Sequence, residues 1–127
     1  MLVKLTLALS ALGLLGFGLA MLIAPAAMLA PVDLAVETAA AYTEIRAFYG
    51  GLEIALGLAL FHCLRQPALH RQGLLLSALC YGCVALTRGS SMLIEGSGGA
   101  FLWSALTLES LLTLACLWAL RGLARER

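Results

Sequence analysis

Residues 2–24 read LVKLTLALSALGLLGFGLAMLIA, an apolar run that only Lys4, Thr6 and Ser10 interrupt. Because an α-helix rises about 1.5 Å per residue, about 20 apolar residues cross the roughly 30 Å hydrocarbon core of a bilayer. The run ends at Pro25, whose ring clashes with a continuing helix. A signal peptide has an apolar core of only about 7 to 15 residues, so we expect a retained transmembrane helix here.

Three further apolar runs of similar length come after it, at about residues 44–64, 72–94 and 100–120. The chain of 127 residues is 62% hydrophobic and 12% charged, whereas soluble domains are about 45 to 50% apolar and about 25% charged. Four spans use most of this length and leave only short connections. The sequence therefore predicts an all-α integral membrane protein, in which residues 1–127 form a single four-transmembrane-helix bundle.

Basic residues are distributed unevenly between the two sides of this layout. The connections at residues 25–43 and 95–99 contain no Lys or Arg, whereas the N-terminal flank, the 65–71 loop and the C-terminal tail do. Short cytoplasmic loops carry an excess of Lys and Arg, so we expect both termini to be cytoplasmic. The basic residues that support this orientation are Lys4, Arg65, Arg71, Arg121, Arg125 and Arg127.

Away from the ends of the predicted spans, four charged residues stand out: Arg46, Glu53, Arg88 and Glu109. Each costs about 2.5 to 3.5 kcal/mol at the centre of a span even on a lenient scale, or roughly 10 kcal/mol for four unpaired charges. Two positive and two negative charges make a neutral set, so we expect the four to meet inside the bundle rather than to face lipid. Such residues are candidates for function by default, although a buried charge cluster also serves to fix helix order and register.

Smaller and polar residues share the helix faces of these charges. At about 100° per residue, Tyr49 and Gly50 follow the same stripe as Arg46 and Glu53. The candidate ligand-binding or buried charge cluster is therefore Arg46, Tyr49, Gly50, Glu53, Arg88 and Glu109. Small residues also recur at helical spacing, and they indicate close helix packing or merely the abundance of Ala and Gly: Gly16, Ala20 and Ala24 on the first span, and Ala47, Gly51, Ala55 and Ala59 on the second.

Other reactive side chains give weaker signals. Cys80 and Cys83 form a C-x-x-C pair, but helical geometry places them away from Arg88, and an i to i+3 pair on a helix is poorly placed for an unstrained disulfide. His62 and His70 do not assemble a haem, zinc or catalytic triad site. The scattered basic residues form no stripe for neutralising phosphates. We expect no catalytic residues, no metal, no cofactor and no nucleic-acid partner.

The segment EIRAFYGGLE, residues 44–53, resembles a bacterial membrane family called domain of unknown function 4345. The likeness extends over nearly the whole chain, although Glu95 stands where that family usually has Asp before the turn glycine, here Gly96. The resemblance implies a four-helix protein of the bacterial cytoplasmic (inner) membrane without a settled activity. It supports as motif positions Arg46, Tyr49, Gly50, Gly51, Glu53, Arg88 and Glu109.

These patterns leave three functional hypotheses open. The first is a protein that binds or moves a small polar or amphipathic ligand through the intramembrane Arg/Glu cluster. The second is a non-catalytic accessory subunit of a larger membrane complex, or a homo-oligomer. The third is a membrane redox enzyme that uses Cys80 and Cys83, which their geometry disfavours. Under each of these hypotheses we expect the protein to be embedded in the lipid bilayer.

Overall fold

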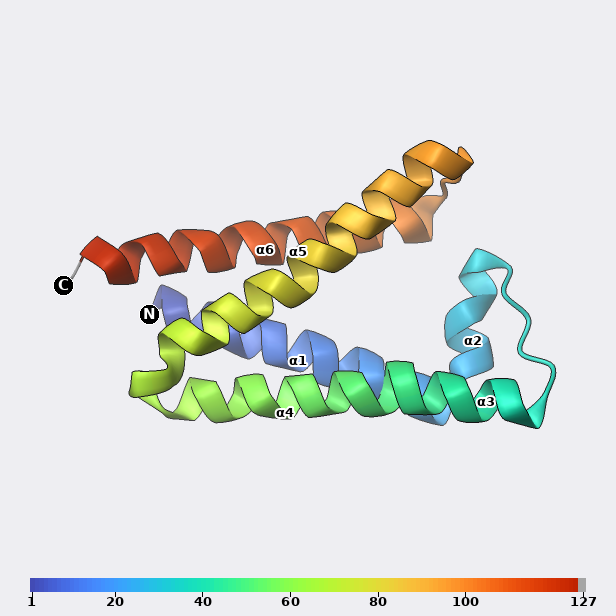
Figure 1. Ribbon diagram of the computed structural model, residues 1–127, viewed down its shortest axis with the longest axis horizontal. Helices are drawn as coiled ribbons and strands as arrows, with labels where there is room; N and C mark the ends of the chain where they lie inside the picture. Colours follow the sequence, from blue (N-terminus) through green and yellow to red (C-terminus); the bar gives the residue numbers. More distant parts are fainter. Residues whose placement is uncertain (126–127) are drawn as a thin grey trace.

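The computed structural model describes residues 1–125, and these residues contain helices and connections but no strand. Four helical segments are long and apolar enough to cross a membrane: Leu2–Ile23, Ala39–Arg65, Pro67–Glu95 and Ala100–Ala124. The expected all-α architecture with four transmembrane helices is therefore confirmed (Figure 1). Arg127, which contributes to the expected basic tail, lies outside the described residues.

The first span is α1 (Leu2–Ile23), and the chain changes direction directly after it. Ala24 leaves the helical conformation with φ −135° and ψ 59°, and Pro25 then takes the first position of α2 (Pro25–Leu29). A short 3₁₀ turn, η1 (Ala30–Val32), comes next and lies against the last span. The connection after the first span is therefore partly helical, and α2 turns steeply away from α1 (Figure 1).

The second span begins earlier than the sequence pattern predicted, at Ala39 rather than near residue 44. Thr38 explains this start, because its Oγ1 accepts a hydrogen bond from the backbone N–H of Ala41 at 3.1 Å and caps the helix. The span continues without a break through α3 (Ala39–Ile45), the π-helical turn η2 (Arg46–Gly51) and α4 (Leu52–Arg65). The backbone N–H of Leu52 donates to the carbonyl of Ala47, an i to i+5 bond that defines the wider turn.

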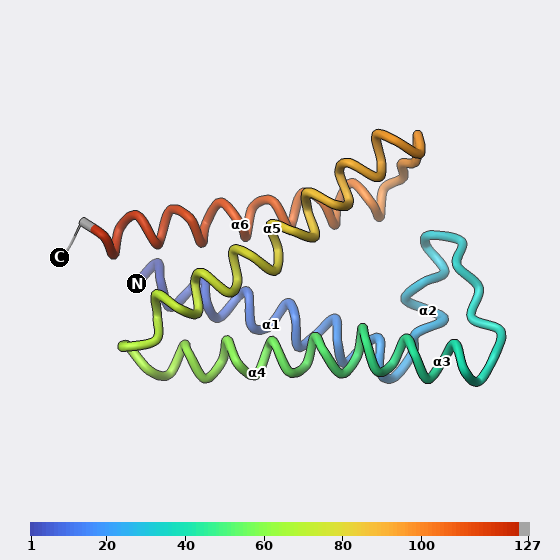
Figure 2. The backbone as a smooth tube through the Cα atoms, viewed as in Figure 1, coloured from blue at the N-terminus to red at the C-terminus, as the bar shows by residue number. Residues whose placement is uncertain are grey.

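The third and fourth spans form a helical hairpin. A 3₁₀ turn, η3 (Pro67–Leu69), leads into α5 (His70–Glu95), and α6 runs over Ala100–Arg125. Gly96 ends α5 in the left-handed conformation with φ 62°, where a residue without Cβ is least strained. The start of α1, the connection from α4 to α5 and the end of α6 all lie at one end of the molecule (Figure 2).

The four spans pack as two helix pairs, α1 with α4 and α5 with α6, which meet through α1 (Figure 1). Glycines allow the close approach of α1 and α4: a Cβ on Gly18 would lie 2.9 Å from the backbone N of Ile54, and one on Gly57 would lie 2.9 Å from that of Leu15. The small-residue rows expected to pack are on other faces. A Cβ added to Gly16 would meet no other described part of the chain within 4 Å.

A compact core lies where the two pairs meet. Its fully buried side chains come from all four spans and include Leu7, Leu60, Leu74 and Cys116. Large apolar side chains cover the outside of every span instead of being confined to this core. That distribution suits a protein whose outer surface faces lipid, since lipid tails leave no penalty on exposed Leu or Phe.

Candidate functional site

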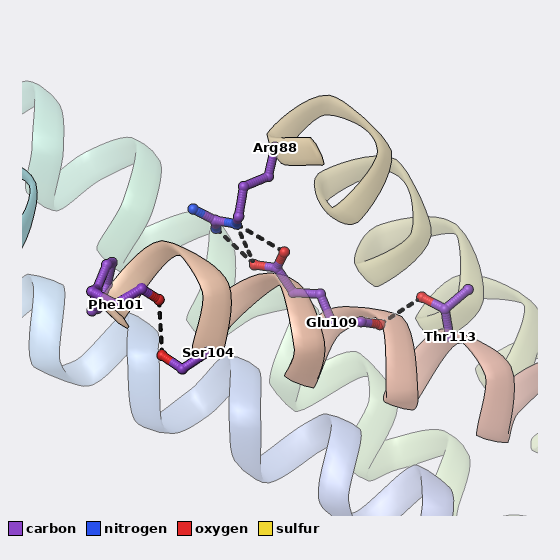
Figure 3. A network of polar contacts seen from close by, with 5 residues as sticks. All are labelled: Arg88, Phe101, Ser104, Glu109 and Thr113. Carbon is purple, nitrogen blue, oxygen red and sulfur yellow. Dashed lines mark hydrogen bonds and ion pairs between the residues drawn. The ribbon is translucent and has the colours of Figure 1, made fainter. Parts of the chain in front are cut away.

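The centre of the candidate site is an ion pair between α5 and α6. The Nη2 of Arg88 donates to Oε1 of Glu109 at 2.7 Å, and its Nε donates to Oε2 at 2.9 Å and to Oε1 at 3.2 Å (Figure 3). The side chains are 27% and 11% exposed, respectively. Two parallel hydrogen bonds between a guanidinium and a carboxylate give both strength and a fixed orientation.

One face of the guanidinium remains uncommitted in this arrangement. The Nη1 of Arg88 makes no hydrogen bond to any residue that the structure describes, and it points away from Glu109 (Figure 3). Glu109 is further anchored through its backbone, because the hydroxyl of Thr113 donates to its carbonyl at 2.8 Å. The pair is therefore a charge-neutral unit that still presents N–H donors.

Arg88 also lines an open hollow of about 460 Å³ along the last turns of α5 and the start of α6. Its lining combines the hydroxyl residues Thr87, Ser91 and Ser97 with apolar side chains such as Met92 and Leu102. Cys83 belongs to the same lining. Cys83 and Arg88 point in different directions from the helix axis, but the hollow is wide enough for both to line it.

Arg46 does not join the ion pair. Its Nε donates to the backbone carbonyl of Leu22 at 3.0 Å, and its guanidinium lies over the ring of Tyr42, 5.4 Å from the centroid. The last carbonyls of a helix lack intrahelical partners, and Pro25 has no N–H to offer to the end of α1. Arg46 therefore supplies a donor and a positive charge where the end of a helix favours both.

The remaining predicted site residues occupy different surroundings. Glu53 is half-buried and forms no ion pair or hydrogen bond within residues 1–125, although it lies within electrostatic range of Glu109. Gly50 is buried against Leu22, and Tyr49 is 51% exposed. The structure therefore brings Arg88 and Glu109 together, places Glu53 nearby, and does not unite all four charges in one paired set.

A second polar cluster joins α1 to α5 and α6. Ser77 Oγ donates to Ser10 Oγ at 2.7 Å, Cys116 Sγ donates to Ser77 Oγ at 3.1 Å, and the hydroxyl of Tyr81 donates to the carbonyl of Ser10 at 2.8 Å. All four residues are buried. Cys116 therefore takes part in a buried hydrogen-bonded cluster that links three of the four spans.

Ser10 was not predicted to belong to such a cluster, although the sequence contains a signal. Thr6 and Ser10 are one helical turn apart and therefore lie on the same face of α1. Both are buried. Two polar interruptions on one face of an otherwise apolar span mark the side that packs against other helices, because a polar group facing lipid would lack a partner.

The match to one family model covers most of the chain. A family model described as domain of unknown function (DUF4345) matches residues 2–120. The chain belongs to this family. No curated protein and no solved structure matches the chain.

The motif segment of this DUF4345 member coincides with the π-helical turn, since residues 46–51 include Arg46, Tyr49 and Gly50. π-helical turns occur frequently at functional sites. Within η2, Arg46 binds the end of α1 and Gly50 packs on it. The segment therefore fixes α1 to the second span at the end of the molecule nearer to the hollow's α5–α6 turn (Figure 1).

The two histidines of this DUF4345 chain hydrogen-bond near the α4–α5 connection. His62 bonds to the amide of Gln66 at 3.3 Å and His70 to the carbonyl of Leu64 at 3.2 Å. Across the described part of the chain, no three metal-ligating side chains come together. The hypothesis that Cys80 and Cys83 do not act as a redox pair stays a prediction.

Proposed function

We propose that this protein binds a small amphipathic molecule in the open hollow beside Arg88. The proposal rests on one observation: the Nη1 of Arg88 makes no hydrogen bond within the described residues, and Arg88 lines a hollow that is otherwise largely apolar. A pocket with apolar walls and a few convergent polar groups is the usual form of a small-molecule site. The apolar part of the ligand would lie along Val84, Met92 and Leu102, and its polar head would meet Arg88.

The charge of the ion pair narrows the chemistry of that head group. Glu109 already neutralises Arg88, so the site offers N–H donors with little net positive charge. The hydroxyls of Thr87, Ser91 and Ser97 add further donors and acceptors around the hollow. This combination favours a compact head group that accepts hydrogen bonds, such as a carbonyl, a hydroxyl or a carboxyl group.

The hollow also has a proposed position relative to the two sides of the membrane. The basic flanks Lys4, Arg65, Arg71 and Arg121 support cytoplasmic termini, which would place the hollow near the α5–α6 turn in the extracytoplasmic half of the membrane. We place the protein in the bacterial cytoplasmic membrane as part of the same proposal, on the basis of the resemblance of residues 44–53. The ligand would then enter from the outer leaflet or from the extracytoplasmic side.

The two tryptophans of the chain provide a direct binding assay. Trp103 directly follows Leu102 of the hollow, whereas Trp118 lies near the opposite end of α6. A W118F variant leaves Trp103 as the sole tryptophan, and a fatty acid brominated on its acyl chain is the quencher. We expect saturable quenching of Trp103 in detergent micelles and gradual, non-saturable quenching of Trp118 in the matched W103F variant.

The head-group contact is tested with R88Q and E109Q combined, because removing one partner alone would strand the other charge. We expect the double substitution to raise the half-saturating concentration about tenfold, which corresponds to about 1.4 kcal/mol. Quenching of Trp103 that never saturates, or a half-saturation unchanged in the double variant, would contradict the proposal.

An accessory role in a larger complex or a homo-oligomer is the second candidate. One observation favours it: the small-residue row on the second span is exposed, although such rows allow helices to approach closely. The row consists of Ala47, Gly51, Ala55 and Ala59. Co-purification of another membrane protein, or of a second copy, in fixed stoichiometry is the expected sign. Replacing Ala55 and Ala59 by Leu should then disrupt the assembly.

A further inference from the structure

Glu53 differs from the other three intramembrane charges because it has no partner among the residues that the structure describes. Its side chain is directed at the bundle, since a Cβ added to Gly18 of α1 would lie 3.0 Å from the Cβ of Glu53. It is half-buried, and it makes no hydrogen bond or ion pair to a residue that the structure describes. Its carboxyl group therefore needs another source of neutralisation inside the membrane.

Neither arginine of the spans supplies that neutralisation. Arg88 places both of its bonded nitrogens on Glu109. Arg46 is about two turns away on the same span and donates to the carbonyl of Leu22. An ionised Glu53 would thus be an uncompensated negative charge in a hydrocarbon environment, which is the costly case for a membrane protein.

The titratable groups within electrostatic range of Glu53 on the neighbouring spans add no positive charge either. They are Cys80 and Tyr81 on α5, and Glu109 on α6. The hydroxyl of Tyr81 is already committed to the carbonyl of Ser10. From α1 the nearest contact is the backbone of Gly18, and the one charged side chain of α1, Lys4, is close to its other end.

We propose that the Glu53 carboxyl is a proton-binding site within the membrane, and that it carries its proton at neutral pH. Its surroundings favour the neutral form, because the carboxyl is half-buried and because Glu109, which holds Arg88, lies within electrostatic range. Glu53 remains partly exposed at the surface of the bundle, so its carboxyl is not sealed in the core. Loss of the proton would create a second carboxylate within electrostatic range of Glu109, the partner of Arg88.

This inference does not depend on the amphipathic ligand proposed above, because it concerns the charge of Glu53 in the protein alone. The chain has six glutamates, Glu37, Glu44, Glu53, Glu95, Glu109 and Glu126. Their carboxyl carbons can be observed by NMR in the full-length protein, labelled with ¹³C at the glutamate carboxyl and held in maltoside micelles. The chemical shift of this carbon distinguishes a protonated carboxyl from a carboxylate.

We expect the signal removed by E53Q to have the shift of a protonated carboxyl at neutral pH and to move to that of a carboxylate in alkaline solution. E44Q is the matched control, because Glu44 is exposed on the same span, and it should remove the signal of a carboxylate. A Glu53 signal that is already that of a carboxylate at neutral pH, or that becomes so on adding sodium ions, would overturn the proposal.

E53Q also tests the proposal through folding, because glutamine has the shape and the neutrality of a protonated glutamate. We expect E53Q to keep the thermal unfolding midpoint of the unmodified chain in the same micelles. A variant that fails to fold, or that unfolds at a markedly lower temperature, would show that the negative charge of Glu53 is needed and would contradict proton binding at neutral pH.

Discussion

The contribution of Arg88 and Glu109 depends on both being present. Each side chain lies within a transmembrane span, so each would cost several kcal/mol as an isolated charge. Three hydrogen bonds between them satisfy one edge of the guanidinium and both carboxylate oxygens. Buried ion pairs add little relative to apolar replacements, but breaking one leaves an uncompensated charge. The pair therefore acts as one neutral unit in the bundle.

A double-mutant cycle on this pair tests that interpretation. We expect R88Q and E109Q each to lower the thermal stability in detergent by more than the combined variant does, because the double change strands no charge. The coupling free energy should be about 0.5 to 3 kcal/mol, the range found for residues in direct contact. Losses that simply add would mean that the two side chains do not depend on each other.

The sequence accounted for part of this site and not for the rest. The cost of intramembrane charge predicts that Arg88 and Glu109 need partners, and the structure pairs them. Arg46 obeys the same rule, but its acceptor is a backbone carbonyl of Leu22, made available where Pro25 ends α1. Counting charges does not reveal a contact between a side chain and the backbone of another helix. The sequence therefore predicted a cluster of four charges, of which the structure pairs only two.

At the scale of helices, the number of spans was predictable and the packing faces were not. Length and hydropathy suffice to count the spans. Several rows of small residues run along the first two spans, and their spacing alone does not say which row faces a neighbour. The contact uses Gly18, Gly50 and Gly57. The π-helical turn also departs from the regular angle of 100° per residue on which the predicted stripe relied.

Two glycines of α1 allow a test of which small residues are needed for helix packing. We expect G18A to destabilise the protein by about 1 to 3 kcal/mol, because the added Cβ would lie 2.9 Å from the backbone N of Ile54 and force the helices apart. G16A is the matched control and should be neutral or slightly stabilising, since nothing lies within 4 Å and Ala favours helix. Thermal unfolding in detergent compares them, and equal effects would show that α1 and α4 are not in close contact.

For the whole molecule, four spans return the chain to the side from which it started. The start of α1, the α4–α5 connection and the end of α6 lie together at one end (Figure 2). The basic residues Lys4, Arg65, Arg71 and Arg121 belong to this end, and the connection that contains Asp33 belongs to the other. The distribution of Lys and Arg therefore agrees with the geometry, and it predicts the side that faces the cytoplasm.

Reporter fusions test the orientation. A reporter that is active only outside the cytoplasm should be inactive in the 65–71 loop and at the C-terminus, and active at Asp33. The reason is that the basic flanks resist transfer across the membrane. The same fusions carrying a reporter active only in the cytoplasm serve as the control and should give the opposite pattern. Equal signals at Asp33 and at the C-terminus would require a different orientation or number of crossings.

The π-helical turn divides the second span into two helical parts that are rotated relative to each other about the helix axis. A turn closed by i to i+5 bonds holds one residue more than an α-helical turn, so η2 changes the rotational phase of α4 relative to α3 by roughly 100°. The N-terminal part of the span is fixed by the contact of Arg46 with α1, whereas the part after η2 is fixed by Gly57 against Leu15. Removing one residue from η2 would restore uniform winding and force one of these attachments to release, so the extra residue works as a fixed angular offset between them.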